Sequence, residues 1–220
     1  MGSELMSWQL GWYRLAERIS GAFISVVAIG CIAGCFGPGR VTPPKIDAVG
    51  AARAAIQQHD RDGDDFISAG ELDQAPGLRA SRADSNRDGR VTADEIASRI
   101  NKWQTDRVGL ISFVVRITFN DKPLKGAVVE FIPEEFLSGW IEPASGTTDG
   151  NGLAFIGMDS TLLRKDLRRT PLMHCGIYRV EVTHPQIQIS ARYNTKTTLG
   201  QEVAADTIES PYTPIALKSQ

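Results

Sequence analysis

Two twelve-residue segments of the chain repeat one pattern: Asp60-Arg-Asp-Gly-Asp-Asp-Phe-Ile-Ser-Ala-Gly-Glu71 and Asp84-Ser-Asn-Arg-Asp-Gly-Arg-Val-Thr-Ala-Asp-Glu95. We call them loop 1 (residues 60–71) and loop 2 (residues 84–95). Each has Asp or Asn at its first, third and fifth positions, a hydroxyl at the ninth and a glutamate at the twelfth. A hard cation such as Ca²⁺ takes six to eight oxygen ligands at roughly 2.3–2.6 Å, so this pattern favours calcium.

Both segments resemble the EF-hand loop, which implies two Ca²⁺ sites. The resemblance also implies that the backbone carbonyl of the seventh position is a ligand and that the ninth-position hydroxyl contacts the ion through a water molecule. The ligands implied for loop 1 are Asp60, Asp62, Asp64, the Phe66 carbonyl, Ser68 and Glu71. Those implied for loop 2 are Asp84, Asn86, Asp88, the Arg90 carbonyl, Thr92 and Glu95.

The eighth position of each loop is apolar and β-branched, Ile67 in loop 1 and Val91 in loop 2. We therefore expect the loops to pair back to back through a short two-stranded contact. Ser68-x-x-Glu71 and Thr92-x-x-Glu95 are capping boxes, so each loop is expected to lead directly into a helix.

The flanking helices are predicted from apolar spacing. Ile96, Ile100 and Trp103 share one face of a helix that follows loop 2. Thr42-Pro43-Pro44 is expected to start the helix before loop 1, with Ile46, Val49 and Ile56 on one face.

Two features depart from the usual EF-hand pattern. Asp65 replaces the glycine of the sixth position in loop 1, which predicts a more strained first site and leaves open that only one loop binds. The repeats begin 24 residues apart, and Pro76-Gly77 shortens the helix between them. Such short repeats resemble dockerin modules, which bind cohesin domains, whereas dockerins typically close their loops with Asp.

The N-terminus predicts export. Arg14 and Arg18 precede an uncharged run that contains Ile32-Ala33-Gly34-Cys35. This tetrapeptide resembles the bacterial lipoprotein signal, which implies removal of residues 1–34, lipidation of Cys35 and anchoring at a membrane face of the cell envelope, outside the cytoplasm. A plain secretory signal and an uncleaved membrane helix are the alternatives, and translation starts at Met1 or at Met6.

The composition is that of a globular protein, with 220 residues, 42% hydrophobic and 23% charged. The net charge of −2 indicates neither nucleic-acid binding nor strong overall attraction to anionic lipid. Once Cys31 leaves with the signal and Cys35 carries lipid, Cys175 has no intrachain partner and is expected to be a buried, inert thiol.

Apolar and polar residues alternate after Trp103, which predicts strands. The pattern appears at Ile111–Phe119, Ala127–Phe131, Leu153–Ile156, Tyr178–Val182 and Ile215–Leu217. We expect a multi-domain α+β chain: a tether at 35–45, a small all-α calcium-binding domain at 46–104, a linker at 105–109 and an antiparallel, Ig-like or transthyretin-like β-sandwich at 110–220.

The second half resembles the carboxypeptidase regulatory-like, transthyretin-like modules of exported bacterial proteins. The residues that carry the resemblance are Asn120–Ala127, the Thr148-Asp149-x-x-Gly152 turn, Gly176–Val180 and Ala191–Asn194. The segment Gly157–Cys175 departs from a minimal module. Its basic side chains could contact an anionic glycan or lipid head group, although Leu162, Leu163 and Leu167 favour a solvated helical insertion with one docked side.

Catalysis has little support in the motifs. GxSxG, HExxH and CxxC are absent, and the Tyr-Arg-Gly-Ser tail of transthyretin-like hydrolases is replaced by Leu217-Lys-Ser-Gln220. The spacing of His174, Cys175 and His184 matches no familiar metal site, and Asp149-x-Asn151-Gly152 is expected to be a turn rather than a third calcium site.

We therefore predict a non-enzymatic, calcium-binding envelope lipoprotein in which the metal is mainly structural. One alternative is a dockerin-like, calcium-dependent docking module for another envelope protein. Another is a glycan-binding sandwich with an exposed aromatic such as Trp140.

Overall fold

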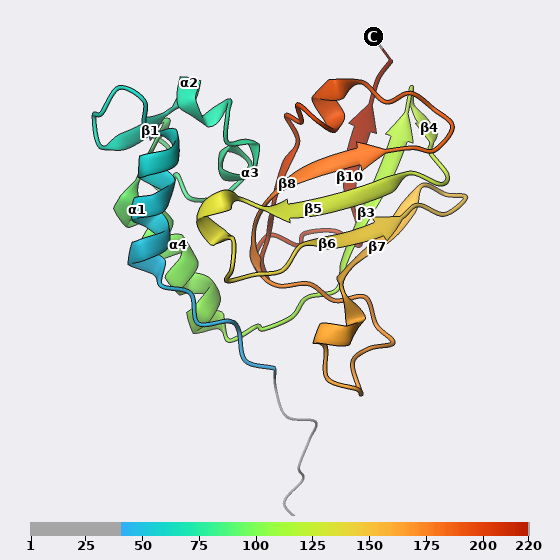
Figure 1. Ribbon diagram of the computed structural model, residues 1–220, viewed down its shortest axis with the longest axis horizontal. Helices are drawn as coiled ribbons and strands as arrows, with labels where there is room; N and C mark the ends of the chain where they lie inside the picture. The colour runs from blue at the N-terminus through green and yellow to red at the C-terminus, as the bar shows by residue number, and fades with distance from the viewer. Residues whose placement is uncertain (1–40, 220) are drawn as a thin grey trace, which may run out of the picture. The chain divides into compact units, whose positions relative to one another are not determined.

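The computed structural model describes residues 41–219, which belong to one compact unit of helices and a sheet (Figure 1). The predicted signal at 1–34 and residues 35–40 of the predicted tether, including Cys35 with its predicted lipid, lie outside the described residues. Within residues 41–219, no helix is long and apolar enough to cross a membrane.

The first part of the described chain is helical, with one short strand pair. Its elements are α1 (Ala48–His59), β1 (Phe66–Ser68), α2 (Ala69–Leu72), α3 (Pro76–Arg79), β2 (Arg90–Thr92) and α4 (Ala93–Asp106). Pro76 occupies the first turn of α3, where its missing N–H costs little. The helix between the loops is interrupted, as expected, and two four-residue helices take its place. The helix α4 includes the first two residues of the predicted linker, Thr105 and Asp106.

Helix α1 begins later than the sequence predicts. Asp47 caps it by accepting a hydrogen bond from Gly50 N at 3.0 Å, and Ala48 is its first residue. The predicted apolar face is wrong at Val49, which is 52% exposed. The buried face is made of Ala48, Ala51, Ala52 and Ala55, whose small side chains allow α1 to lie close beside α4 (Figure 1).

The second part is built on one sheet. Its strands are β3 (Phe113–Phe119), β4 (Lys122–Pro123), β5 (Val128–Pro133), β6 (Ala144–Thr147), β7 (Leu153–Met158), β8 (Gly176–Thr183), β9 (Gly200–Val203) and β10 (Thr213–Leu217). Short 3₁₀ turns lie at η1 (Glu135–Leu137), η2 (Ser160–Leu162) and η3 (Ala191–Tyr193). The strand order is β10-β3-β7-β6-β5-β8-β9, and β4 pairs with β3.

The architecture is α+β, with a curled, mostly antiparallel sheet that resembles a sandwich. The sheet is continuous because β7 pairs with β3 through its first residues and with β6 through its last. Its two halves meet across the core, where the rings of Phe113 on β3 and Phe131 on β5 lie 5.6 Å apart in an edge-to-face contact. The closing strand β10 is found where the sequence predicts, but it runs parallel to β3.

The segment Gly157–Cys175 is not the predicted helix. After β7 it forms η2 and then a series of turns. Leu163 is buried and Leu167 packs partly against the core, whereas Leu162 is 57% exposed. The predicted docked side is therefore correct for two of its three leucines.

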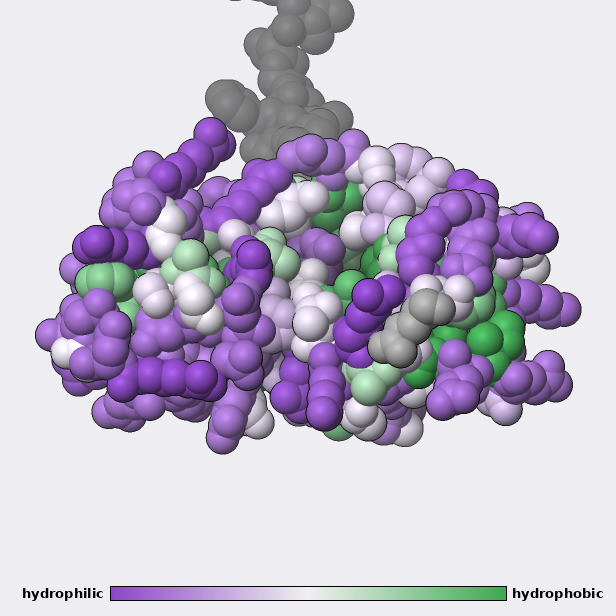
Figure 2. All heavy atoms as spheres, turned by 90° about the horizontal axis from the view of Figure 1, so that it is seen from above, coloured by the Kyte–Doolittle hydropathy of each residue, from purple (hydrophilic) through white to green (hydrophobic). Residues whose placement is uncertain are grey.

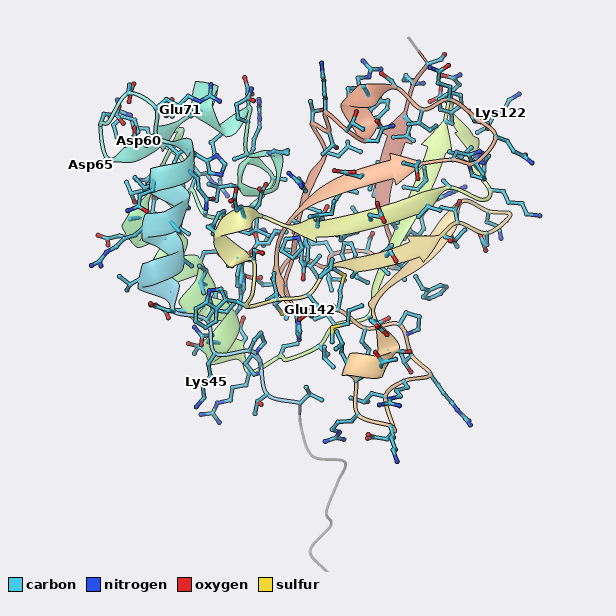
Figure 3. The ribbon with its side chains drawn as sticks, in the orientation of Figure 1. Lys45, Asp60, Asp65, Glu71, Lys122 and Glu142 are labelled. Carbon is cyan, nitrogen blue, oxygen red and sulfur yellow. The ribbon has the colours of Figure 1, made fainter. Side chains whose placement is uncertain are left out.

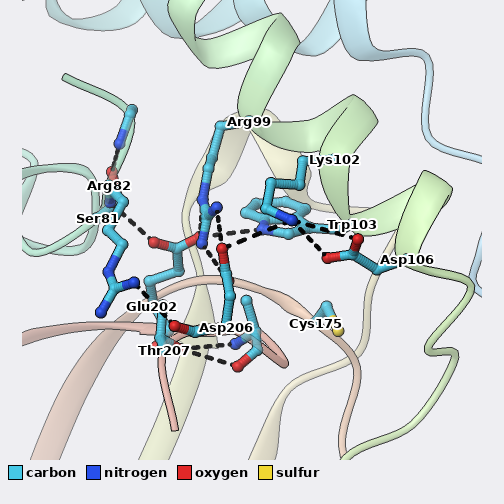
Figure 4. Close-up of polar contacts among 12 residues, drawn as sticks. Ser81, Arg82, Arg99, Lys102, Trp103, Asp106, Cys175, Glu202, Asp206 and Thr207 are labelled. Atoms are coloured by element: carbon cyan, nitrogen blue, oxygen red, sulfur yellow. Dashed lines mark hydrogen bonds and ion pairs between the residues drawn. The ribbon is translucent and has the colours of Figure 1, made fainter. Parts of the chain in front are cut away.

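The helical part and the sheet share a close contact. Gly200 on β9 lies against the backbone of Pro76, where an added Cβ would clash with the Pro76 carbonyl. Nearby, the Arg99 guanidinium of α4 forms an ion pair with Glu202 of β9 at 2.5 Å and with Asp206 at 2.8 Å (Figure 4). Trp103 also donates its indole N–H to Glu202 at 3.0 Å, and Arg82 N donates to the other carboxylate oxygen at 2.8 Å, so the buried Glu202 of the sheet has all three of these partners in the helical part.

Candidate metal centre

Loop 1 gathers three carboxylates at one point. One oxygen from each of Asp60, Asp62 and Glu71 lies within 4.8 Å of the other two, and no other group of three or more acidic, histidine or cysteine ligands is found within residues 41–219. Figure 3 shows Asp60 and Glu71 at the same end of the helical part, with Asp65 on the outer side of the loop. Three converging carboxylates are the donor set that a hard divalent cation requires.

Backbone N–H groups hold Glu71 in place. Its Oε1 accepts a hydrogen bond from Arg61 N at 2.6 Å, and its Oε2 accepts one from Ser68 N at 2.8 Å. These bonds, that from Arg61 above all, lower the pKa of Glu71 to about 2, so the side chain is ionised at neutral pH.

The pKa of Asp62 is shifted in the opposite direction to that of Glu71. Loss of hydration, followed by the negative charge of Asp64, raises the pKa of Asp62. Both effects disfavour the charged carboxylate, and a bound cation would oppose them. Figure 2 looks onto the end of the molecule that carries loop 1, and hydrophilic residues cover most of this face.

Each loop bends through two residues in the left-handed conformation, at its fourth and sixth positions. In loop 1 these are Gly63 (φ +77°) and Asp65 (φ +66°), and in loop 2 they are Arg87 (φ +61°) and Gly89 (φ +82°). Each loop therefore has glycine at only one of the two positions. The expectation that loop 1 is the more strained is wrong in this respect, because Arg87 carries the same type of strain in loop 2.

The first aspartate of each loop stabilises this bend. Asp60 accepts hydrogen bonds from Gly63 N at 2.7 Å and from Asp65 N at 3.0 Å. Asp84 accepts the equivalent sixth-position bond from Gly89 N at 3.1 Å, and its second bond comes from the fifth position, Asp88 N at 3.2 Å, rather than from the fourth. The two loops thus fold in closely similar ways despite their different glycine positions.

The predicted contact between the loops is confirmed. Strands β1 and β2 pair antiparallel with Ile67 opposite Val91, and both side chains are buried. On the other face, the guanidinium of Arg90 lies 4.4 Å from the ring centre of Phe66. Residues at the seventh position of each loop therefore stack on each other, while their carbonyls remain the implied ligands.

Loop 2 is less converged than loop 1. Glu95 accepts hydrogen bonds from Ser85 N and Thr92 N, as Glu71 does from the equivalent residues, and the capping box at Thr92 is present. Asp84, Asp88 and Glu95 do not form a three-carboxylate group, however. Asn86 donates its side-chain amide to Asp88 at 3.1 Å, so the third and fifth ligand positions contact each other.

The other candidate metal ligands lie apart. His184 accepts hydrogen bonds from Gln186 N and Ile187 N through its Nδ1, and its Nε2 lies 2.9 Å from the Lys125 carbonyl oxygen. Asp149 accepts hydrogen bonds from Asn151 N and Leu153 N, the arrangement of the predicted turn. Cys175 is buried, as predicted, and burial raises its pKa to about 12.

The sequence reasoning missed three buried charged residues of the described chain, Arg99, Glu134 and Glu202. Arg99 is on the same face of α4 as Ile96 and Ile100 and is 7% exposed. Glu134, which is 5% exposed, accepts a hydrogen bond from Gly77 N at 2.7 Å. A charged residue on an apolar helix face was the available signal for Arg99, while Glu134 has no comparable pattern around it.

Comparisons of this chain with protein-family models, with curated proteins and with solved structures find no match.

Proposed function

We propose that loops 1 and 2 each bind one Ca²⁺ ion and that the metal stabilises the helical part of the protein. The observation that carries the proposal is the convergence of Asp60, Asp62 and Glu71 within 4.8 Å. Carboxylate oxygens suit a hard cation that accepts variable geometry, and this set contains no nitrogen or sulfur donor that would favour a transition metal.

A structural role for the metal is supported by the way in which the loops are joined. The ligands of each loop flank one strand of the β1–β2 pair, so a cation in either loop favours the conformation that both strands require. A ligand that binds only the folded state raises the free energy of unfolding. Extracellular sites of this kind typically have Kd values of roughly 10⁻⁴ to 10⁻³ M, which suits continuous occupancy rather than switching.

We further propose that the chain is a non-enzymatic lipoprotein of the bacterial cell envelope. Ile32-Ala33-Gly34-Cys35 supports this part of the proposal, because the lipid on Cys35 would attach the protein to a membrane face outside the cytoplasm. The chain from Cys35 to α1 is short, so the protein would stay near that membrane.

The packing of α4 favours the structural role over docking. Its apolar residues Ile96, Ile100 and Trp103 are at most 2% exposed, and α2 has only four residues. A partner that used the apolar faces of the two exiting helices would have to displace these contacts. Glycan binding is supported only by Trp140, which is 41% exposed, and an array probed with the protein would test it.

Calorimetric titration with Ca²⁺ tests the proposal, on a protein comprising residues 36–220. We expect two sites, with Glu71→Gln removing one and Glu95→Gln the other, because each glutamate supplies two of the oxygens in its loop. Glu142→Gln, which changes an exposed carboxylate away from both loops (Figure 3), is the matched control and keeps both sites. Absence of binding heat in the unaltered protein, together with equal melting temperatures in Ca²⁺ and in chelator, would refute it.

A further inference from the structure

The segment from Asp159 to Leu172 is a basic insertion in a chain whose net charge is −2. It contains four basic residues, Arg164, Lys165, Arg168 and Arg169, and two acidic ones, Asp159 and Asp166. Asp166 forms an ion pair with Arg164 at 2.7 Å. Within the described part of the chain, no ion pair or hydrogen bond engages the side chains of Lys165 and Arg169, which are both exposed.

The backbone of this insertion is held in a defined shape. Arg168 donates hydrogen bonds to the carbonyl oxygens of Leu163 at 2.9 Å and Thr161 at 3.2 Å, which closes the turn. Leu163 is buried beneath it. The positive side chains are thus presented from a fixed turn rather than from a loose chain.

The insertion lies beside the point where the described chain begins. Val41 shares a cavity of about 310 Å³ with Leu167 and Leu172 of the insertion and with Arg107, which follows α4. In Figure 1, the segment that precedes α1 and the turn η2 lie at the same end of the molecule. The exposed Arg107 adds a further positive charge there.

This position limits the distance to a membrane, given the lipid on Cys35 that the proposed function assumes. Val41 is the sixth residue after Cys35, and an extended chain spans at most about 3.6 Å per residue, or roughly 20 Å in all. The insertion would therefore be held close to the lipid surface. Lys122 and β4 lie at the opposite end of the sheet (Figure 3).

Two exposed apolar side chains accompany the charges. Leu162 at the tip of η2 is 57% exposed. Phe155 is 58% exposed and lines a hollow of about 280 Å³ together with Arg168 and Arg169. Aromatic and aliphatic side chains next to basic ones are the combination that binds an anionic membrane surface, because the former enter the interface and the latter contact phosphate groups.

We propose that the basic insertion, together with Arg107, is the membrane-facing surface of the protein and binds anionic lipid head groups. This inference rests on the proposed lipid anchor. The anchor alone would leave the protein free to rotate about its tether. The basic surface adds a second attachment and fixes its orientation, with the opposite end of the sheet directed away from the lipid.

Lysine footprinting of the full-length chain tests this proposal. The anchored protein would be reconstituted into vesicles of phosphatidylcholine alone or mixed with phosphatidylglycerol, and amine acylation would be followed by mass spectrometry. We expect modification of Lys165 to slow about five-fold or more on the anionic vesicles only, in line with the attraction of one basic residue to an anionic surface. Salt that shortens the Debye length to about 3 Å should abolish this protection. Lys122 is the internal control and should react equally on both vesicles.

A charge variant provides an independent check. Arg169→Gln with Arg107→Gln removes two positive charges but leaves Lys165 as the reporter, and we expect most of its protection to be lost. Equal reactivity of Lys165 on both vesicles, in protein that stays bound to them, would overturn the inference while leaving the anchor intact. Protein that fails to remain with either vesicle would contradict the lipid anchor itself, and with it this inference.

Discussion

Ile67 of β1 and Val91 of β2 lie directly opposite each other, and their buried side chains join loop 1 to loop 2. Each residue is followed closely by the hydroxyl and glutamate positions of its own loop. A change in the position of one strand therefore moves implied ligands in both loops. From this relationship we predict that the two proposed sites respond together to a change in either strand.

Ile67→Ala should impair both loops although it alters no ligand. Removal of a fully buried isoleucine side chain leaves a cavity and costs about 2–5 kcal/mol of unfolding free energy. Because the strand pair loosens, we expect weaker Ca²⁺ binding at loop 2 as well as at loop 1. Urea unfolding and calorimetry would measure the two effects, with the exposed Val49→Ala as control. Unchanged affinity at loop 2 would show that the loops act separately.

Arg87→Gly should stabilise the protein. A non-glycine residue with φ of +61° is strained by roughly 1–2 kcal/mol, which glycine avoids, although glycine also gives up some of this gain through a more flexible unfolded chain. We expect a net gain of about 0.5–1 kcal/mol in urea unfolding. Asp65→Gly should give less, because aspartate tolerates the left-handed region better. A loss of stability in Arg87→Gly would contradict this prediction and would show that the Arg87 side chain stabilises the protein by more than its backbone strain costs.

Glu202→Ala should uncouple the helical part from the sheet. The change leaves the buried guanidinium of Arg99 with Asp206 alone and removes the acceptor of the Trp103 N–H (Figure 4). Removal of one partner of a buried ion pair typically costs about 3–5 kcal/mol. We expect calorimetric melting to split into two transitions, of which only the first responds to Ca²⁺. Lys102→Ala, at an exposed ion pair, should keep a single transition.

The buried Glu134 should make stability fall as the pH rises. Burial raises its pKa above the ordinary 4.5, against the opposing hydrogen bond from Gly77 N. The unfolded chain loses this proton more readily, so the unfolding free energy decreases as the pH rises from about 4.5 through the higher folded-state pKa. Glu134→Gln keeps an acceptor for Gly77 N and should flatten this part of the profile in urea unfolding. The exposed Glu135→Gln should leave it unchanged.

Cys175 should be unreactive in the folded protein. Burial raises its pKa to about 12, so very little thiolate is present at pH 8. In a protein comprising residues 36–220, where it is the only cysteine, we expect a chromogenic disulfide reagent to react only after unfolding. Rapid reaction in native buffer would instead indicate local opening around Val108, whose carbonyl contacts the thiol.

Local sequence patterns predicted much of the fold because their physical causes are local. Alternation placed Val115, Ile117, Val180 and Val182 in the core, and all four are fully buried. The capping box at Thr92 and the β-branched eighth positions likewise gave the start of α4 and the pairing of β1 with β2. In the candidate site, the same spacing brought Asp60, Asp62 and Glu71 together.

The remaining features depend on partners distant in sequence or on backbone conformation. Arg99 and Glu202 are 103 residues apart, and no periodicity indicates that one will neutralise the other. The left-handed conformation of Arg87 is imposed by the loop and has no side-chain signature. The alanine face of α1 was overlooked because close packing against α4 selects small residues there rather than large apolar ones.

The parallel pairing of β10 with β3 has a consequence for the order in which the protein is made. Strand β3 begins at Phe113, yet its edge partner is supplied only by residues 213–217. A polypeptide interrupted before Thr213 would present an open edge of β3, with unpaired backbone groups able to recruit another chain. Completion of the sheet must therefore wait until residues 213–217 have been made, long after β3, and until then the open edge of β3 can pair with another chain and cause aggregation.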